Sequence, residues 1–247
     1  MLGIVPAAGI ATRLQPLGGS KELLPLGWAG KRLRVVADYL LERMEVAGVD
    51  RVCMVIAPQK ADLLRFFAAS PLASRLFFVV QPKPAGLCDA VFRAAPFVAA
   101  DEHVLIGLPD TVWLPQQAYA HALRPAIHLI TFPVEQPEHF DAVIAAAGDR
   151  VARVEVKRPG DTGRRVWGAI TAPGSEFLAL HRLWRERHGR DEYLGDLFNA
   201  AIAAGQAVTF DQQGTHYWDI GTPAGYARAW QDLAWSGPTA ADAIQAA

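Results

Sequence analysis

The chain has 247 residues, of which 51% are hydrophobic and 20% are charged, and its formal net charge is −1. This is the composition of a globular protein, and the length suits one domain of generous size. Lysines and arginines are scattered and form no basic face, so the composition argues against a nucleic-acid partner.

The N-terminal apolar run ends at Gly9 and has no basic segment before it, so we expect no signal peptide. No window of about 18 apolar residues exists, so no membrane partner is expected either. The two cysteines, Cys53 and Cys88, fall in a predicted strand and a predicted helix. Both fit small core residues in a reducing compartment, and we expect a cytoplasmic protein.

The first 130 residues alternate short apolar strands with helices. Continuous apolar strands separated by helices predict an α/β, Rossmann-like fold with a mostly parallel sheet and helices on both faces. Gly48 is the expected C′ residue of the first helix. The predicted strands are Leu2–Ala7, Arg51–Ile56, Leu76–Val80, Val104–Leu108 and Ile127–Thr131, and the predicted helices are Val35–Ala47, Lys60–Phe67, Leu87–Ala94 and Gln116–Ala122.

The second half of the chain begins with a different pattern. Asp141–Ala147 and Arg150–Val156 flank Gly148-Asp149, which predicts an inserted β-hairpin. Thr222 and Pro223 are the expected N-cap and N1 residues of a last helix. Further elements are helices at Glu176–Arg187 and Leu194–Ala204 and a strand at Ala207–Phe210.

No internal repeat and no long linker divides the sequence. We therefore expect a single domain over residues 1–235. Its nucleotide-binding part would cover about 1–130 and its sugar-binding part about 131–215. Residues 236–247 form an Ala-rich tail that we expect to fray.

The loop after the first strand, Val5 to Leu14, is made of small residues and carries Arg13, with Lys21 further on. Small side chains let backbone N–H groups approach a ligand, and the two cations supply donors for phosphate oxygens. The loop therefore favours a polyphosphate site at the carboxyl end of the strand. An ordinary glycine-rich turn is the alternative, since neither the G-x-x-x-x-G-K-[ST] nor the G-x-G-x-x-G pattern is present.

Four more positions suit the chemistry of a nucleotide site. Gln81 has the amide groups to read a base edge, and Gly86 lets the backbone come close. Asp110 and Asp219 each follow an apolar run, and carboxylates with phosphate oxygens are the usual ligands of Mg²⁺. Lys157 follows the predicted hairpin and could hold a second phosphate. Taken one by one, each also has an ordinary explanation as a turn, helix-cap or solvated residue.

Together these segments resemble the sugar-1-phosphate nucleotidylyltransferases, and most of all the glucose-1-phosphate thymidylyltransferases. The resemblance spans residues 1 to about 230. It is carried by Ala7–Leu17 (A-A-G-x-G-T-R-L-x-P-L in the family), Ser20–Pro25 (S-K-x-L-L-P), Gln81–Leu87 (Q-P-x-P-x-G-L), Asp110, and Tyr217–Pro223 (W-x-D-I-G-T-P).

The resemblance implies an enzyme that joins a nucleoside triphosphate, TTP or UTP, to a sugar 1-phosphate and releases pyrophosphate. Asp110 and Asp219 would hold Mg²⁺, the expected cofactor, and would act in catalysis with Arg13, Lys21 and Lys157. The implied nucleotide-binding residues are Ala8, Gly9, Thr12, Arg13, Lys21, Gln81, Gly86 and Leu87. The implied sugar-phosphate-binding residues are Glu155, Lys157, Trp167 and Gly168.

Three features depart from the family pattern. Ala11 replaces a glycine, so a positive φ there would be strained. Pro109 stands where a glycine usually precedes the metal aspartate. The family's E-K-P becomes Glu155-Val156-Lys157-Arg158-Pro159, which puts the glutamate in doubt.

Two alternatives stay open. A cytidylyltransferase acting on an alcohol phosphate would share the opening loop and its lysine, and Ala11 with the altered E-K-P would suit a catalytically silent protein that binds nucleotide sugars. The chain also stops short of a helical tail that many bacterial relatives carry. We expect a monomer or a small homo-oligomer.

Overall fold

The computed structural model describes residues 1–29, 32–157 and 163–233. The predicted tail over 236–247 and the positions of Arg158 and Pro159 lie outside the described residues. No helix in the described part of the chain is long and apolar enough to span a membrane.

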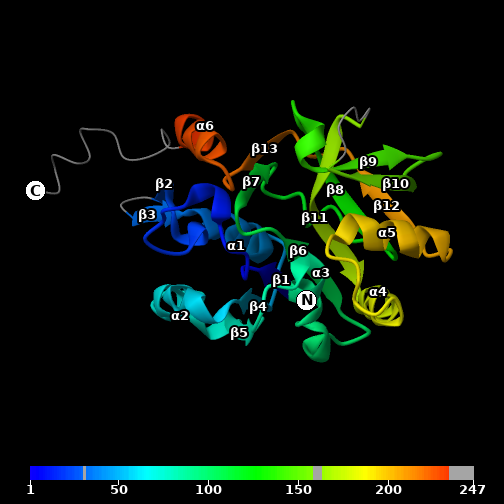
Figure 1. The fold of residues 1–247 in the computed structure, drawn as a ribbon, viewed down its shortest axis with the longest axis horizontal. Coiled ribbons are helices and arrows are strands. Elements are labelled where there is room, and N and C mark those ends of the chain that lie inside the picture. Colours follow the sequence, from blue (N-terminus) through cyan, green and yellow to red (C-terminus); the bar gives the residue numbers. More distant parts are fainter. Residues whose placement is uncertain (30–31, 158–162, 234–247) are drawn as a thin grey trace, which may run out of the picture.

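A mixed sheet forms the centre of the molecule (Figure 1). Within the described residues it contains β1 (Leu2–Pro6), β4 (Arg51–Ile56), β5 (Leu76–Val80), β6 (His103–Gly107), β8 (Ile127–Pro133), β9 (Asp141–Ala145), β10 (Val151–Val156), β11 (Arg165–Pro173) and β12 (Val208–Asp211). The main path runs β10-β9-β11-β6-β1-β4-β5, while β8 pairs with β11 and β12.

The sheet is parallel in its N-terminal half, where β6, β1, β4 and β5 lie side by side. It turns antiparallel at β11, which pairs with β6, β8 and β9. A single sheet therefore joins strands from both halves of the sequence, and β11 is the strand that connects them.

Helices cover both faces of the sheet, as predicted. They are α1 (Val36–Val46), α2 (Ala61–Ala68), α3 (Gly86–Phe92), α4 (Gly174–Glu186) and α5 (Leu194–Ala203), while α6 (Pro223–Leu233) packs in a separate core. Residues of β1 alternate between the two faces: Leu2 and Ile4 enter the core with α3, α4 and α5, and Val5 enters the core with α1 and α2. The α/β fold predicted from the sequence is thus confirmed.

A third, smaller core packs the C-terminal helix against elements from the N-terminal part of the chain. It contains Leu26, Val36, Trp218, Ile220 and Ala229, from two small sheets and two helices. The small sheets are β2 (Pro25–Ala29) with β3 (Arg32–Val35), and β7 (Thr111–Leu114) with β13 (His216–Asp219). Figure 1 shows α6 lying beside β2 and β3, and the Tyr226 hydroxyl donates a 2.5 Å hydrogen bond to the Pro25 carbonyl.

The β-hairpin around Gly148 is confirmed, as are the last helix and its cap. Gly148 has a φ of +69°, and the Gly225 N–H donates to the Thr222 hydroxyl over 3.1 Å. The helix predicted over Gln116–Ala122 is wrong. The backbone hydrogen bonds in this segment join an N–H group to the carbonyl three residues earlier, for example that of Ala118 to that of Pro115. The segment therefore forms successive turns.

Gly174 begins α4 at a point where the chain passes close to another loop. A Cβ added there would overlap the carbonyl oxygen of Ala99. The Gly174 N–H donates a hydrogen bond to the backbone carbonyl of Glu102 over 2.6 Å. We expect Gly174→Ala to lower the free energy of unfolding by more than about 2 kcal/mol. Urea unfolding measures this. Gly18→Ala, where a Cβ would meet nothing within 4 Å, is the control. Equal effects of the two changes would contradict the prediction.

Candidate active site

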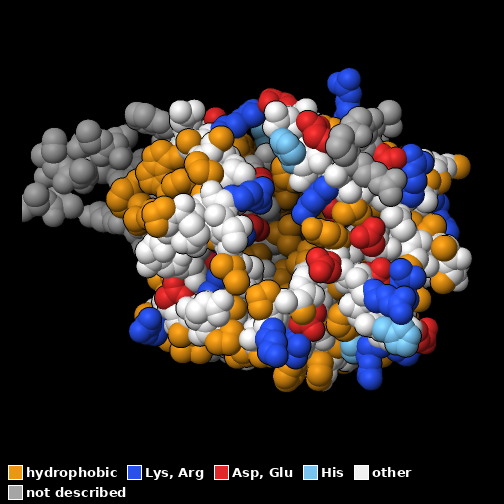
Figure 2. Space-filling model, in the orientation of Figure 1, with side chains coloured by type: hydrophobic (Ala, Val, Ile, Leu, Met, Phe, Trp, Pro, Cys, Tyr) orange, Lys and Arg blue, Asp and Glu red, His pale blue; other side chains and the backbone are white. Residues whose placement is uncertain are grey.

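A cavity of about 310 Å³ opens at the carboxyl ends of β1 and β6. It gathers six of the predicted nucleotide-binding residues and Asp110, from four separate segments of the chain. They are Ala8, Gly9, Lys21, Gln81, Gly86 and Leu87. Figure 2 shows this face of the molecule hollowed near its middle, with basic and acidic side chains around the rim.

Lys21 is fixed in this cavity because both of its neighbours are anchored to the start of α2. Ser20 donates from its backbone and its hydroxyl to Asp62, over 2.7 and 2.8 Å. Glu22, only 1% exposed, accepts from the Lys60 ammonium at 2.8 Å through each oxygen. The Lys21 side chain is thereby directed to Asp110, and its Nζ contacts Asp110 Oδ2.

Burial by itself would lower the pKa of Lys21, but the contact with Asp110 outweighs it and raises that pKa above its usual value. Burial likewise works against ionisation of Asp110, and the charge of Lys21 overcomes it and lowers the pKa of this carboxyl. The two groups are therefore held as an ion pair, with an acidic oxygen and a cation at the wall of the cavity.

Pairing of β7 with β13 brings Asp219 next to Asp110. Asp219 lies opposite Thr111 in the register, and the Ile220 N–H donates to the Asp110 carbonyl over 2.9 Å. Burial and the negative charge of Asp110 raise the pKa of Asp219. One of its oxygens accepts from the Gly221 N–H over 2.8 Å. The two aspartates that the sequence singled out thus form a carboxylate pair.

Arg13 reaches the same pair from the loop after β1. Its side chain is 62% exposed, and its NH2 lies 3.9 Å from Asp219 Oδ2. It belongs to a short helical turn over Thr12–Leu14, where Thr12 is exposed. Ala11 has a φ of −14°, so it does not adopt the positive φ that the family's glycine suggested.

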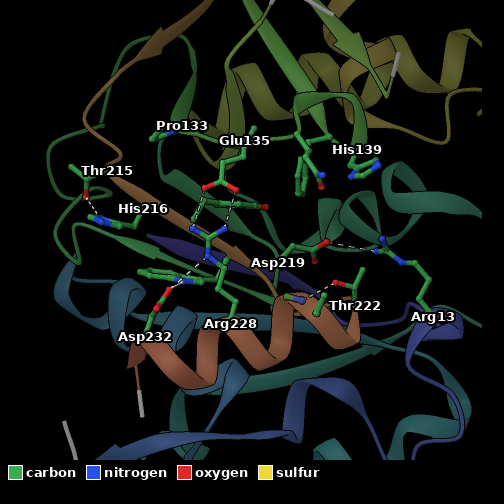
Figure 3. Close-up of a pocket in the computed structure, with 17 residues that line it drawn as sticks. Arg13, Pro133, Glu135, His139, Thr215, His216, Asp219, Thr222, Arg228 and Asp232 are labelled. Atoms are coloured by element: carbon green, nitrogen blue, oxygen red, sulfur yellow. Dashed lines mark hydrogen bonds and ion pairs between the residues drawn. The ribbon is translucent and has the colours of Figure 1, made fainter. Parts of the chain in front are cut away.

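Arg13 and Asp219 also line a second cavity of about 510 Å³ (Figure 3). The Arg228–Glu135 ion pair, at 3.2 Å, lies at this cavity and joins α6 to the segment after β8. The charge cluster of Lys21, Asp110, Asp219 and Arg13 therefore has one cavity on each side.

Gln81 lies at the first cavity with its amide already oriented. Its NH2 donates to Asp89 Oδ2 over 2.8 Å and to the Gly86 carbonyl over 3.2 Å. Since both partners are acceptors, the amide oxygen is the group left to face a ligand. The sequence analysis expected both amide groups to be available. Gly86 has a φ of +83°, and a Cβ there would meet Glu192, so close packing explains the glycine.

The four predicted sugar-phosphate residues lie on β10 and β11 or directly after β10, and two of them, Lys157 and Trp167, interact with the same buried carboxyl, that of Asp141. Lys157 places its ammonium 4.3 Å from the centre of the Tyr193 ring. Glu155 pairs with Arg153, and Gly168 leaves room for the Tyr217 ring. Trp167 packs against Phe198. Among the described lining residues of the two cavities, none of these four occurs.

Sequence reasoning missed two residues near these groups, Asp141 and Tyr217. Burial raises the pKa of the Tyr217 hydroxyl, and the charges of Asp219, Asp110 and Asp141 add to that shift. Asp141 is itself 8% exposed. Burial raises its pKa to about 6, although the positive charge of Lys157 opposes this. An acidic residue opening a predicted strand, Asp141–Ala147, was the available signal.

The structure is that of an α/β protein with a charge cluster beside its sheet that suits phosphate chemistry. The chain belongs to the family described as "Nucleotidyl transferase", whose model matches residues 2–235.

The relatives by sequence include the glucose-1-phosphate thymidylyltransferase of Neisseria meningitidis serogroup A. It is 28% identical over 167 residues, which cover 64% of this chain and 56% of that protein. The enzyme of the same name from Neisseria gonorrhoeae is 31% identical over 153 residues, or 58% and 51% of the two chains. The chain spans about half the length of the curated relatives it matches.

Two solved structures have the same fold. A putative glucose-1-phosphate thymidylyltransferase from Bacillus anthracis, in complex with a sucrose, superposes with a TM-score of 0.80 at 19% identity. The match covers 96% of this chain and 100% of that one. The UDP-glucose pyrophosphorylase of Acinetobacter baumannii gives 0.75 at 18% identity, over 93% and 92% of the chains.

Because the pKa of Asp141 in the folded protein lies above its ordinary value of 3.8, the unfolded chain ionises first as the pH rises. As the pH rises from about 4 to about 6, the buried Asp141 carboxyl therefore lowers the free energy of unfolding progressively. Above about pH 6 the whole of this loss remains. We expect Asp141→Asn to raise the free energy of unfolding at pH 7.5, by up to about 3 kcal/mol, and to have little effect near pH 4.

Urea unfolding at the two pH values measures this difference. The control is Asp38→Asn, since the carboxylate of this buried aspartate accepts the Val35 N–H at the start of α1 over 3.0 Å. This change removes a negative charge from the first turn of α1, so it should lower stability at neutral pH. A stabilisation by Asp141→Asn that does not depend on pH would contradict the prediction.

Proposed function

We propose that the protein transfers a nucleotidyl group from a nucleoside triphosphate, TTP or UTP, to a sugar 1-phosphate and releases pyrophosphate. One observation carries the proposal: Lys21 and Asp110 are in contact at the wall of a cavity lined by the Gly9 loop and Gln81, and Asp219 and Arg13 lie beside that pair at the wall of the second cavity. Membership of the nucleotidyl transferase family supports the same reaction class.

In this proposal the base occupies the cavity beside Gln81. The amide oxygen of Gln81 accepts a hydrogen bond from the N3–H of thymine or uracil. Cytosine has an acceptor at N3, so it would face that oxygen with a second acceptor. Glu192 packs closely against Gly86 at the wall of this cavity, and we expect this packing to favour a pyrimidine over a purine.

The triphosphate extends from the base toward Lys21 and Arg13. Lys21 is buried and fixed by its anchored neighbours, so it serves as a preset donor to phosphate oxygens. Arg13 is exposed and lines the second cavity, so it can contact the outer phosphates. These two residues offset the negative charge that develops as pyrophosphate leaves.

The carboxylate pair of Asp110 and Asp219 fits a Mg²⁺ ion. Both offer hard oxygen ligands, and burial and the charge of Asp110 raise the pKa of Asp219, an effect that a bound cation would oppose. Two carboxylates with phosphate oxygens and water make a full coordination set for this ion. When bound, Mg²⁺ would neutralise phosphate charge at the reacting centre.

The sugar phosphate supplies the nucleophile, an oxygen that is already ionised at neutral pH, so the reaction needs no general base. Lys157 holds this phosphate in the proposed arrangement. Its ammonium rests on the Tyr193 ring here, and its stem can carry it to a phosphate. In-line attack on the α-phosphorus then depends on positioning and charge neutralisation.

We expect Asp219→Asn to reduce Mg²⁺-dependent pyrophosphate release by 100-fold or more, since it removes one of two carboxylates from the metal site. The same change should leave thermal stability equal or higher, because it relieves repulsion between two neighbouring carboxylates. Turnover and the melting temperature are measured together, with Mn²⁺ binding followed by electron paramagnetic resonance.

Glu135→Gln is the control, because Glu135 carries the same charge but forms an exposed pair with Arg228. It should keep turnover within about twofold. Full Mg²⁺-dependent turnover by Asp219→Asn would refute the metal assignment. Absence of pyrophosphate release by the unaltered protein, with any pair of substrates, would favour a silent nucleotide-sugar-binding protein.

The base assignment predicts an order of triphosphates: TTP first, UTP second, and CTP and the purine triphosphates far behind. The gap between TTP and UTP should be small, since one methyl group in an apolar pocket is worth about 1–3 kcal/mol. A competition assay with five triphosphates at fixed Mg²⁺ measures the order. A preference for CTP, ATP or GTP would overturn the role of Gln81.

A further inference from the structure

Gln81 is fixed in the wall of the first cavity through both its backbone and its side chain. Its backbone N–H donates to the Ile56 carbonyl over 2.9 Å, which continues the pairing of β4 with β5 by one residue. The residue is only 5% exposed and is among those that line the first cavity. Because the backbone is held and the side chain is enclosed, the group presented to the cavity depends on which way the amide is turned.

Two acceptors set the orientation of that amide. The Gln81 NH2 donates to Asp89 Oδ2 over 2.8 Å and to the Gly86 carbonyl over 3.2 Å. A hydrogen bond to a carboxylate is shorter and about twice as strong as one between neutral groups, so Asp89 is the stronger of the two partners. If the amide turned over, its oxygen would face both acceptors. The NH2 group is therefore held away from the cavity, mainly by Asp89.

Asp89 is in turn held by Arg93, four positions along the chain. The Arg93 Nε donates to Asp89 Oδ2 over 3.2 Å, and its NH2 donates to Asp89 Oδ1 over 3.0 Å. The Asp89 side chain is 13% exposed, so this is a mostly buried carboxylate with a bidentate partner. Arg93 can only donate and the carboxylate can only accept, so Gln81 has to donate to Asp89. Its oxygen is then the group on the opposite side of the amide.

We propose that Asp89 is a positioning residue that sets the base specificity of the first cavity, because it fixes the Gln81 amide with its oxygen toward the base. The inference rests on the proposed function and names the residue behind its order of triphosphates. Asp89 is not among the described residues that line the cavity, so it acts through Gln81 and not by touching the nucleotide.

The chemistry of the base edge gives this orientation its consequence. An amide oxygen accepts from the N3–H of thymine or uracil, whereas the N3 of cytosine is itself an acceptor. A glutamine whose amide could turn would serve either base, since it would offer its oxygen to one and its NH2 to the other. The exclusion of cytosine therefore depends on the Asp89 carboxylate as much as on Gln81.

The test replaces Asp89 by Asn, which has nearly the same shape but carries a donor as well as an acceptor. In Asp89→Asn the Gln81 amide can turn its oxygen to the new NH2 group and its own NH2 to the base. We expect the unaltered protein to bind UTP about 100-fold or more tightly than CTP, and Asp89→Asn to reduce this ratio by about tenfold or more. UTP and CTP are chosen because they differ only on the edge of the base that Gln81 would read.

Isothermal titration calorimetry with the α,β-methylene analogues of UTP and CTP, at fixed Mg²⁺, measures the two dissociation constants without turnover. The kcat/KM values for UTP and CTP are measured in parallel by pyrophosphate release, with the sugar 1-phosphate that reacts fastest. The ratio of the two triphosphates should change in the same direction in both experiments.

Two further variants separate orientation from packing. Val91→Ala removes methyl groups from a fully buried position of α3, two residues after Asp89. It should lower the melting temperature and leave the ratio of UTP to CTP within about twofold. Arg93→Gln removes the guanidinium but keeps the carboxylate that accepts from Gln81, so the ratio should fall less than in Asp89→Asn.

Two results would overturn the inference. If Asp89→Asn changes the melting temperature but not the ratio of UTP to CTP, Asp89 serves only the packing of α3. If Val91→Ala changes the ratio as much as Asp89→Asn does, the effect belongs to the helix and not to the carboxylate. The calorimetry also separates this inference from the proposed function. An unaltered protein that prefers the UTP analogue, loses the preference in Asp89→Asn and releases no pyrophosphate would contradict the proposed reaction and support the role of Asp89.

Discussion

The pairing of β7 with β13 is the constraint on which the site depends. It places Asp219 opposite Thr111, and hence beside Asp110, although the two aspartates come from opposite ends of the chain. Two neighbouring carboxylates in a partly buried position repel each other, and the raised pKa of Asp219 records that repulsion together with the burial. The fold holds them there because Trp218, Ile220 and Ala229 bury apolar surface in the third core.

A second constraint fixes the cations. Lys21 lies between Ser20 and Glu22, which are tied to Asp62 and Lys60 near the start of α2. A buried ion pair such as Glu22–Lys60 adds little net stability, because desolvation offsets the attraction, but losing one partner leaves an uncompensated charge. The Glu22–Lys60 pair instead holds Lys21 in one position. The loop before it, by contrast, is mostly exposed.

The parallel half of the sheet was predictable because its strands are short apolar runs between clear helices, as at Arg51–Ile56. The strand β11 was missed since Val166 to Ala172 is buried on both faces and rich in small residues, so no alternation marks it. The aspartate pair was predicted from the runs that precede each residue. Glu155 was predicted as a sugar-phosphate-binding residue from the motif alone. Only the register of β9 with β10 shows that the acidic residue opposite Val156 is Asp141.

The charge cluster is balanced without a ligand, and this balance bears on how substrates enter under the proposed function. A metal ion arriving alone has to displace Lys21 from Asp110. A triphosphate arriving alone has to draw Lys21 away, which exposes two carboxylates to its own negative charge. Either ligand alone thus breaks the Lys21–Asp110 ion pair and leaves one of these two charges without a counter-ion. Together they re-form the balance, because the carboxylates gain the metal and the cations gain the phosphates. Metal and triphosphate binding are therefore coupled through Lys21.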